Sequence, residues 1–379
     1  MSPAVEVAGI GLHPFGRFAG ATVTDLGVIA VRAALREANV GRGEFQAAFC
    51  GTAYSGVAAG HKVLGALGLT GMPIVDVEAG CASGGAALML GAGAIRSGQY
   101  DTVLVFGMEK MPKGIIRSSF FEPWREEAGL AATPAYFALR AQRLMRDSGV
   151  TVDHLAEVVV KNRHNGVHNP DALFRSAVGA HDVLASRVVC EPLRLWMLCS
   201  PDEGAAAVVL RRASSRPGVT VEAAALRSHL PGSVLGEATP MAGLVDDSFP
   251  SPTGLAAQAA FAEAGIEPGD LDVVECQDTD AARELLSYEE LGLCAPGDAA
   301  RFLDAGTPAM TGRLPVNPSG GLLSKGEPLG ASALGQVVEL VLQLRGRAGR
   351  RQVDGARVAL AHTVGRGANA CVVILRANA

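Results

Sequence analysis

The chain has 379 residues, of which 49% are hydrophobic and 19% are charged, and its formal net charge is -5. This composition supplies a large buried core, excludes a disordered or fibrous protein, and gives no overall electrostatic reason to bind nucleic acid. No apolar run reaches the roughly 20 residues of a membrane helix, and the amino terminus lacks a signal-peptide pattern. We therefore expect a soluble cytoplasmic protein.

The first 110 residues alternate between helical and strand-like patterns. An amphipathic helix is predicted over 24–38, a strand over 74–79, a Gly/Ala-rich helix over 82–98 and an apolar strand over 101–109. Alternation of this kind is typical of an α/β fold, and it predicts a largely parallel, buried sheet.

The pattern changes between residues 111 and 189, where Pro, Trp, Arg and His are interspersed among short helical segments. Such a stretch is typical of a cover over a site. Beyond it, EGAAAVVLRR is predicted to be a buried strand, and a polar connector follows at 213–218. Alternation then returns, with helices predicted over 283–292 and 332–345 and strands over 358–363 and 370–377.

Seven cysteines are scattered along the chain and form no CxxC pair, which favours neither a zinc site nor a disulfide framework. Cys81 differs from the other six because it stands where the strand IVDVEA meets the Gly/Ala-rich helix. Unpaired N–H groups at a helix N-terminus stabilise a thiolate, so Cys81 is the candidate nucleophile. We expect no metal and no cofactor.

Six segments resemble, in the same order, the sterol-carrier and lipid-transfer branch of the thiolases: EAGCASGGAA, GMEKMPKG, KNRHNGVHNP, CSPDEGAAAVVL, LLSYEELGLC and NPSGGLLSKGEPLGAS. The resemblance implies the five-layered α/β thiolase fold, with two similar mixed-sheet halves and an inserted loop domain. We place the N-terminal half at 1–215, with the cover at about 111–189, and the C-terminal half at 216–379. Family members form an acyl-cysteine from an acyl-CoA and pass the acyl group on, or run this backwards, and Cys81 falls on the nucleophile position.

The resemblance breaks at two catalytic motifs. Where the branch has His-Asp-Cys-Phe, with an oxyanion-binding His and an acid/base Cys, this chain reads QDTD and begins with Gln277. Where the branch has Gly-His-Pro, this chain carries Glu327 in SKGEPLG. A carboxylate donates no hydrogen bond to an oxyanion unless it is protonated, so the loop has lost or changed its role.

Three other segments supply candidate site residues by resemblance. In AHTVGRGANACVV, His362, Gly365 and Gly367 are retained, and backbone N–H groups of this loop with that of Cys81 would bind the thioester oxyanion, whereas Arg366 and Ala368 depart from the pattern. Asn317 and Ser319 in NPSGG would shape the pocket floor, and His164 in KNRHNGVHNP would lie near the pocket.

The altered motifs leave three interpretations open. In the first, Cys81 takes an acyl group and Glu327 deprotonates the acceptor, because burial raises a carboxyl pKa toward a useful range. In the second, the protein is an aldolase-like lyase of β-hydroxyacyl-CoA, in which Tyr288, Glu327 or His362 moves protons. In the third, it is a non-catalytic subunit that binds acyl-CoA.

The expected partners follow from the resemblance and from local charge. We expect an acyl-CoA or acyl-carrier substrate, a homodimer, and a small OB-fold acyl-CoA-binding protein as a possible partner subunit. Several basic residues lie in and around the predicted cover. They either bind the phosphates of CoA or form a solvent-exposed face. These residues are Lys110, Lys113, Arg117, Arg125, Arg140, Arg143, Arg146, Lys161 and Arg163.

Overall fold

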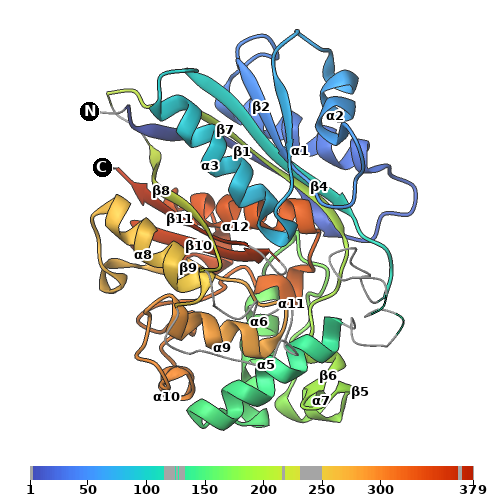
Figure 1. Ribbon diagram of the computed structural model, residues 1–379, viewed down its shortest axis with the longest axis vertical. Helices are drawn as coiled ribbons and strands as arrows, with labels where there is room; N and C mark the ends of the chain where they lie inside the picture. The colour runs from blue at the N-terminus through green and yellow to red at the C-terminus, as the bar shows by residue number, and fades with distance from the viewer. Residues whose placement is uncertain are drawn as a thin grey trace.

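The computed structural model describes residues 3–114, 124, 127, 133–215, 218–230, 250–365 and 369–378 (Figure 1). Nine strands form one mixed sheet in this part of the chain, in the order β3-β2-β4-β7-β1-β8-β11-β10-β9. They are β1 (Val5–Gly16), β2 (Ala47–Gly51), β3 (Ile74–Val77), β4 (Thr102–Lys110), β7 (Glu203–Arg212), β8 (Val219–Ser228), β9 (Val273–Glu275), β10 (Val358–Gly365) and β11 (Asn369–Ala377).

The prediction of a largely parallel sheet is wrong. Only β2–β3, β2–β4 and β9–β10 pair in parallel, whereas β1–β7, β1–β8, β4–β7, β8–β11 and β10–β11 are antiparallel in the described residues. The long strand β1, which the sequence patterns did not predict, causes much of the difference. It pairs with β7 along most of its length and touches β8 only at Val5 and Glu6.

Helices divide the strands into layers (Figure 1). They are α1 (Val23–Ala38), α2 (Ala59–Leu67), α3 (Ser83–Arg96), α5 (Thr133–Ser148), α6 (Val152–Gly166), α7 (Ala180–Ala185), α8 (Pro252–Ala264), α9 (Ala281–Glu290), α10 (Ala299–Asp304), α11 (Gly321–Lys325) and α12 (Leu329–Leu344). Helix α1 packs on β1, β4 and β7, and α8 packs on β8 and β11. Helices α3 and α12 lie between the two groups of strands and contact both, which produces the five layers.

Close backbone contacts hold the central helices at a fixed depth. A Cβ at Gly107 of β4 would lie 2.0 Å from the Gly330 carbonyl oxygen, and one at Gly330 would lie 2.6 Å from the carbonyl oxygens of Gly51 and Met108. No side chain fits in either place, so α12 begins directly against β2 and β4. This contact sets the position of Glu327, which stands just before the helix.

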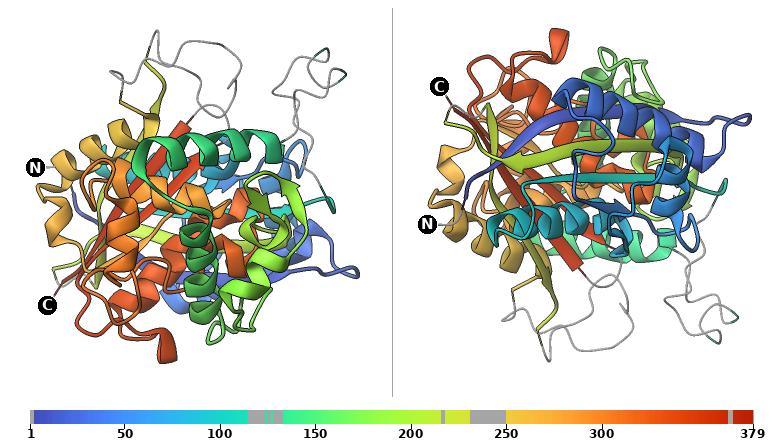
Figure 2. Two further views of the ribbon diagram at one scale, coloured as in Figure 1. Left: turned by 90° about the horizontal axis from the view of Figure 1, so that it is seen from below. Right: turned by 90° about the horizontal axis from the view of Figure 1, so that it is seen from above.

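The described part of the cover predicted over 111–189 is formed by α5, α6, α7 and the start of β5 (Val188–Cys190), which pairs with β6 (Leu193–Arg194) just beyond that range. In the left view of Figure 2 the green helices α5 and α6 lie in front of the sheets. They share one apolar core with α8, α9 and the strands β8 to β11. No helix among the described residues is long and apolar enough to cross a membrane.

The predicted division at residue 215 stays a prediction, but most predicted elements are present. The helices over 24–38, 283–292 and 332–345 correspond to α1, α9 and α12, and the strands over 101–109, 203–212 and 358–363 correspond to β4, β7 and β10. The strand over 74–79 is β3, which is a half-exposed edge strand and is not buried.

Candidate active site

A cavity of about 1200 Å³ lies between the sheet and the cover. Its inner wall comes from the residues that follow β3 and β9, including Cys81 and Gln277, and from the end of β10, including Val364. Its outer wall comes from the cover, including Phe137 of α5 and Arg163 of α6. The described part of the cover therefore borders the cavity, and the cavity is large enough for an extended substrate.

Cys81 stands at the start of the central helix, as the sequence predicts. It lies in a 3₁₀ turn, η1 (Gly80–Ala82), that runs directly into α3. The Ser83 hydroxyl fixes this turn, since it accepts from the Ala79 N–H at 2.9 Å and donates to the Gly80 carbonyl at 2.6 Å. Cys81 is 6% exposed and borders the cavity. Helix-terminal N–H groups favour its thiolate form.

The end of β10 packs against this turn. A Cβ at Gly365 would lie 1.9 Å from the Ala79 carbonyl oxygen, so only glycine allows the approach. Gly365 is thus next to the segment that carries Cys81, where the predicted oxyanion-binding loop begins. Gly367, Arg366 and Ala368 lie outside the described residues, and the role predicted for the loop stays a prediction.

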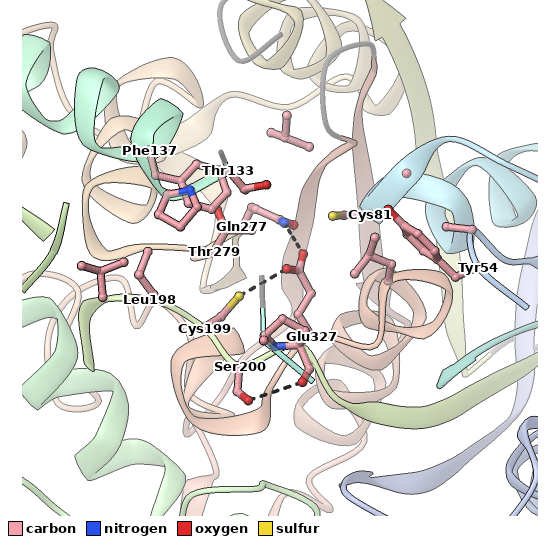
Figure 3. A pocket seen from close by; sticks show the side chains of 18 of the residues that line it. Tyr54, Cys81, Thr133, Phe137, Leu198, Cys199, Ser200, Gln277, Thr279 and Glu327 are labelled. Atoms are coloured by element: carbon pink, nitrogen blue, oxygen red, sulfur yellow. Dashed lines mark hydrogen bonds between the residues drawn. The ribbon is translucent and has the colours of Figure 1, made fainter. Parts of the chain in front are cut away.

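Glu327 faces Cys81 across the cavity wall (Figure 3). Its backbone N–H donates to the Ser200 carbonyl at 2.8 Å, and the preceding Gly326 has a φ of 89°. Its carboxylate accepts from the Gln277 amide at 2.9 Å and from the Cys199 thiol at 3.2 Å. Two donors therefore converge on one 3% exposed carboxylate that faces Cys81.

Burial raises the pKa of Glu327, and the neighbouring Cys81, Cys199 and Gln277 side chains oppose this rise in part. A carboxylate of raised pKa is a stronger base than an exposed one. It can accept the proton of the adjacent thiol and return it to a leaving group. The arrangement is that of a nucleophile paired with its base.

Cys199 also contacts Glu327, and the sequence did not predict this contact. It stands between the cover and β7, and its N–H donates to the Thr279 carbonyl at 2.9 Å, which sets its thiol beside Glu327. Burial raises the pKa of Cys199 well above its usual range, and the neighbouring Glu327 charge acts in the same direction. Cys199 is therefore a neutral donor to the carboxylate and is not a second nucleophile.

The four residues that replace the branch's His-Asp-Cys-Phe motif separate into two pairs. Gln277 and Thr279 line the cavity. Asp278 turns away and accepts from the Leu322 N–H at 2.7 Å at the start of α11, and Asp280 caps α9 and forms an ion pair with Arg140. Gln277 is thus the member of the segment that reaches Glu327.

The predicted floor residues have structural roles here. Asn317, at a φ of 55°, accepts from the Cys276 N–H at 2.9 Å and donates to Glu284 at 2.7 Å. The Ser319 hydroxyl donates to Glu275 at 2.7 Å. Neither residue lines the cavity, so both stabilise the turn behind it.

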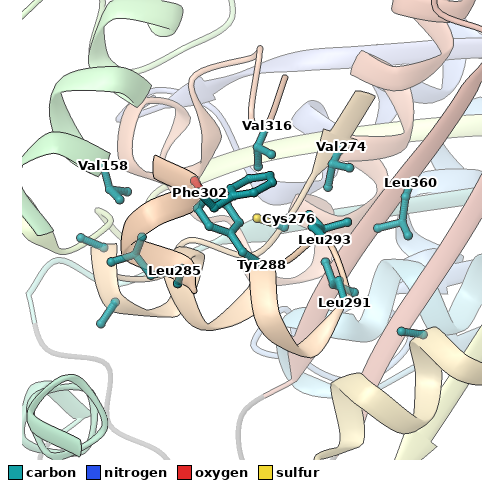
Figure 4. Packing of buried hydrophobic residues seen from close by; sticks show 14 of the residues in the cluster. Val158, Val274, Cys276, Leu285, Tyr288, Leu291, Leu293, Phe302, Val316 and Leu360 are labelled. Atoms are coloured by element: carbon teal, nitrogen blue, oxygen red, sulfur yellow. The ribbon is translucent and has the colours of Figure 1, made fainter. Parts of the chain in front are cut away.

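The structure does not bring His362, His164 or Tyr288 to the cavity. His362 is fully buried on β10, with Nε2 3.0 Å from the Thr253 hydroxyl, and burial lowers its pKa well below the usual range. His164 lies on the exposed face of α6. The Tyr288 ring packs against Phe302 and its hydroxyl donates to a buried glutamate (Figure 4). No cluster of three potential metal ligands occurs among the described residues.

Comparison with known proteins agrees with this geometry. Residues 5–181 match the N-terminal domain of thiolase, and residues 241–377 match a thiolase C-terminal domain-like family. The chain is 33% identical to sterol carrier protein 2 of Oryctolagus cuniculus over 99% of its own length and 72% of that protein. The chain belongs to the thiolase superfamily. It has the five-layered thiolase fold predicted from the motifs.

Two further similarities bear on the chemistry of this thiolase-superfamily member. It is 36% identical to an acetyl-CoA acetyltransferase of Methanothermobacter thermautotrophicus, over 95% of this chain and 96% of that protein. Its structure is similar to a solved Ltp2-ChsH2(DUF35) aldolase, with a TM-score of 0.86 and 25% identity over 99% of this chain and 98% of that chain.

Proposed function

We propose that the protein is an acyltransferase in which Cys81 carries the acyl group and Glu327 moves the protons. The observation that supports this most strongly is the buried Glu327 carboxylate, which faces Cys81 in the wall of a large cavity. A base beside a thiol at a helix start is what acyl-cysteine formation requires.

In the first half-reaction Glu327 accepts the Cys81 proton, and the thiolate attacks the thioester carbonyl of an acyl-CoA. Backbone N–H groups at the start of α3 stabilise the negative oxygen that forms. The carbon–sulfur bond to CoA then breaks, and Glu327 returns the proton to the leaving CoA thiolate. The products are acyl-Cys81 and free CoA.

In the second half-reaction Glu327 removes a proton from an acceptor, which attacks acyl-Cys81. The acyl group moves to the acceptor, and the proton on Glu327 restores the Cys81 thiol. One carboxyl group serves both steps because each step takes up and releases one proton. We propose that an acyl-CoA is the donor and that neither a cofactor nor a metal takes part.

The test is the intact mass of the purified protein after incubation with a panel of acyl-CoAs. We expect a gain of one acyl group that is lost in Cys81→Ala. The matched control is Cys294→Ala, because Cys294 is half-buried and lies outside the cavity. No adduct with any acyl-CoA, with or without a partner subunit, would contradict the proposal.

A lyase acting on β-hydroxyacyl-CoA is the second candidate, and the likeness to the Ltp2-ChsH2(DUF35) aldolase favours it. Glu327 would then be the proton acceptor without an acyl-cysteine. Cleavage of a β-hydroxyacyl-CoA by Cys81→Ala at the parent rate would establish this reaction, because it needs no thiol. Loss of all turnover in that variant would exclude it.

We also propose that the protein works as a homodimer and with a small OB-fold subunit that binds acyl-CoA. The same aldolase supports the second part, because it pairs Ltp2 with ChsH2(DUF35). Purification of the protein co-expressed with the neighbouring open reading frames, followed by mass measurement of the native complex, tests both parts. A monomer that transfers acyl groups at full rate would contradict them.

A further inference from the structure

Arg163 is a buried cation that faces the cavity without an anionic partner. It lies on α6, is 7% exposed, and forms part of the cavity wall. Its guanidinium lies over the Phe174 ring, 4.0 Å from the ring centre, and Phe174 lines the same cavity. Among the described residues no carboxylate pairs with Arg163, and its buried Nε has no hydrogen-bond partner.

This arrangement is costly unless a ligand completes it. An arginine side chain stays charged, and a buried charge without a partner is strongly disfavoured. Burial alone lowers the pKa of Arg163 to about 10, with no nearby carboxylate to oppose the effect. The guanidinium therefore stays positively charged and is available to bind an anion from outside the chain.

The carboxylates that line the cavity do not fill this role. Glu327 accepts from Gln277 and Cys199, and the exposed Glu78 accepts from the Gly80 N–H at 2.8 Å. Arg17, another cation of the cavity wall, already donates to the Met111 carbonyl at 2.6 Å and lies 3.7 Å from Glu203. Arg187 also lines the cavity, but it is exposed to solvent. Arg163 thus differs from the other charged groups of the wall because it is buried and no carboxylate of the described residues pairs with it.

We infer that Arg163 binds a free carboxylate carried by the acyl chain of the substrate, so that the preferred donors are CoA thioesters of dicarboxylic acids. The planar guanidinium can donate two parallel hydrogen bonds to one carboxylate. The Phe174 ring, on which the guanidinium is stacked, fixes the orientation of its plane. The aromatic wall formed by Phe137 and Phe174 would contact the methylene groups between the carboxylate and the thioester.

The inference rests on the proposed function, since it places the thioester at Cys81, but its test measures binding alone. Equilibrium binding to Cys81→Ala, which forms no acyl-cysteine, is measured for malonyl-, succinyl-, glutaryl- and adipyl-CoA. Each is compared with the acyl-CoA of equal carbon number: propionyl-, butyryl-, pentanoyl- and hexanoyl-CoA. We expect at least one dicarboxylic ester to bind roughly ten- to a hundredfold more tightly than its match.

The second arm removes the cation in the same Cys81→Ala background. Arg163→Met should abolish the preference within each pair, Arg163→Lys should keep part of it, and the exposed neighbour Arg175→Met should keep it all. If Arg163→Met fails to fold, the preference of the Cys81→Ala protein and the partial effect of Arg163→Lys still decide the question.

The third arm separates an acyl carboxylate from a CoA phosphate as the anion. It repeats the comparison with N-acetylcysteamine thioesters, which carry no phosphate. Retained preference for the dicarboxylic esters supports the inference. It is overturned if no pair differs, or if Arg163→Met weakens all CoA esters equally and leaves the N-acetylcysteamine esters unaffected.

Discussion

Two buried polar clusters lie side by side in this protein, and they differ in how completely their groups are paired. The rear cluster, behind the cavity, centres on Glu284, which accepts from Asn162, Asn317 and Tyr288 and lies 2.9 Å from the Lys161 ammonium. The cavity cluster centres on Glu327 and leaves the Gln277 carbonyl oxygen without a partner. Complete pairing indicates a structural role, and incomplete pairing beside a cavity indicates a chemical one.

The largest effect is expected from Glu327→Gln, which keeps the shape of the cavity cluster and removes its base. We expect the rate of acyl-Cys81 formation near neutral pH to fall by about two to four orders of magnitude. Rapid-quench mass spectrometry measures this rate. A variant that acylates as fast as the parent protein would remove the chemical distinction between the two clusters.

Glu284→Ala tests the rear cluster, since it removes the carboxylate that pairs with the Lys161 ammonium and that accepts from Asn162, Asn317 and Tyr288. We expect the free energy of unfolding to fall by about 3–5 kcal/mol, measured by urea denaturation. The control is Glu157→Ala on the exposed face of α6, which should change it by less than about 0.5 kcal/mol. Equal effects of the two variants would show that the rear cluster contributes little to stability.

Cys199→Ala sharpens the description of the cavity cluster, because it removes one donor from Glu327 and keeps the other, Gln277. The ionised carboxylate loses stabilisation, so its pKa rises further. We expect the acidic limb of the acylation rate to move to higher pH by about one unit, with little change on the plateau. An acidic limb at the same pH as in the parent protein would mean that the Cys199 contact does not affect the pKa of Glu327.

Asp202→Asn should have the smallest effect, and its sign depends on pH. Burial raises the pKa of Asp202 well above its usual range, and neither carboxyl oxygen has a partner. Below the unfolded-state pKa both states are protonated. As pH rises above that value the unfolded state ionises first, so the parent protein loses stability until the pH passes the folded-state pKa.

Asparagine does not titrate, so the stability advantage of Asp202→Asn should grow with pH. We expect a difference of about 1 kcal/mol or more near pH 8 and a smaller one near pH 5. Melting temperatures of both proteins across this range measure it. An advantage that is constant with pH would show that Asp202 is ionised in the folded protein throughout.

The sequence predicted the fold because its motifs span most of the chain, and it predicted Cys81, Gln277 and Glu327 because these stand at motif positions. The structure places all three on one cavity wall. Asn317 and Ser319 also stand in a motif, but motif membership does not distinguish a residue that lines a pocket from one that supports its turn. Whether each residue acts in catalysis stays a prediction.

The sequence motif pointed to His164 as a residue near the pocket and gave no special role to its neighbour Arg163. The helical periodicity of this segment nevertheless indicates which of the two residues is buried. The buried positions of α6 recur as Leu155, Val159, Asn162 and Gly166, and Arg163 falls on this face, whereas His164 falls on the opposite one. Cys199 stands in the motif CSPDEGAAAVVL, but this pattern does not indicate what its thiol contacts. Its approach to Glu327 depends on a contact between segments 128 residues apart, which local patterns do not encode.

The most direct test of the role of Glu327 is the pH dependence of acyl-Cys81 formation in single-turnover reactions of the parent protein and Glu327→Gln. In the parent protein we expect the rate to rise with pH through an inflection above the ordinary range of a glutamate pKa, because burial raises the Glu327 pKa. The inflection should disappear in Glu327→Gln, and the remaining rate should be low. An unchanged inflection and an unchanged plateau in the variant would contradict a role for Glu327 as the base of Cys81.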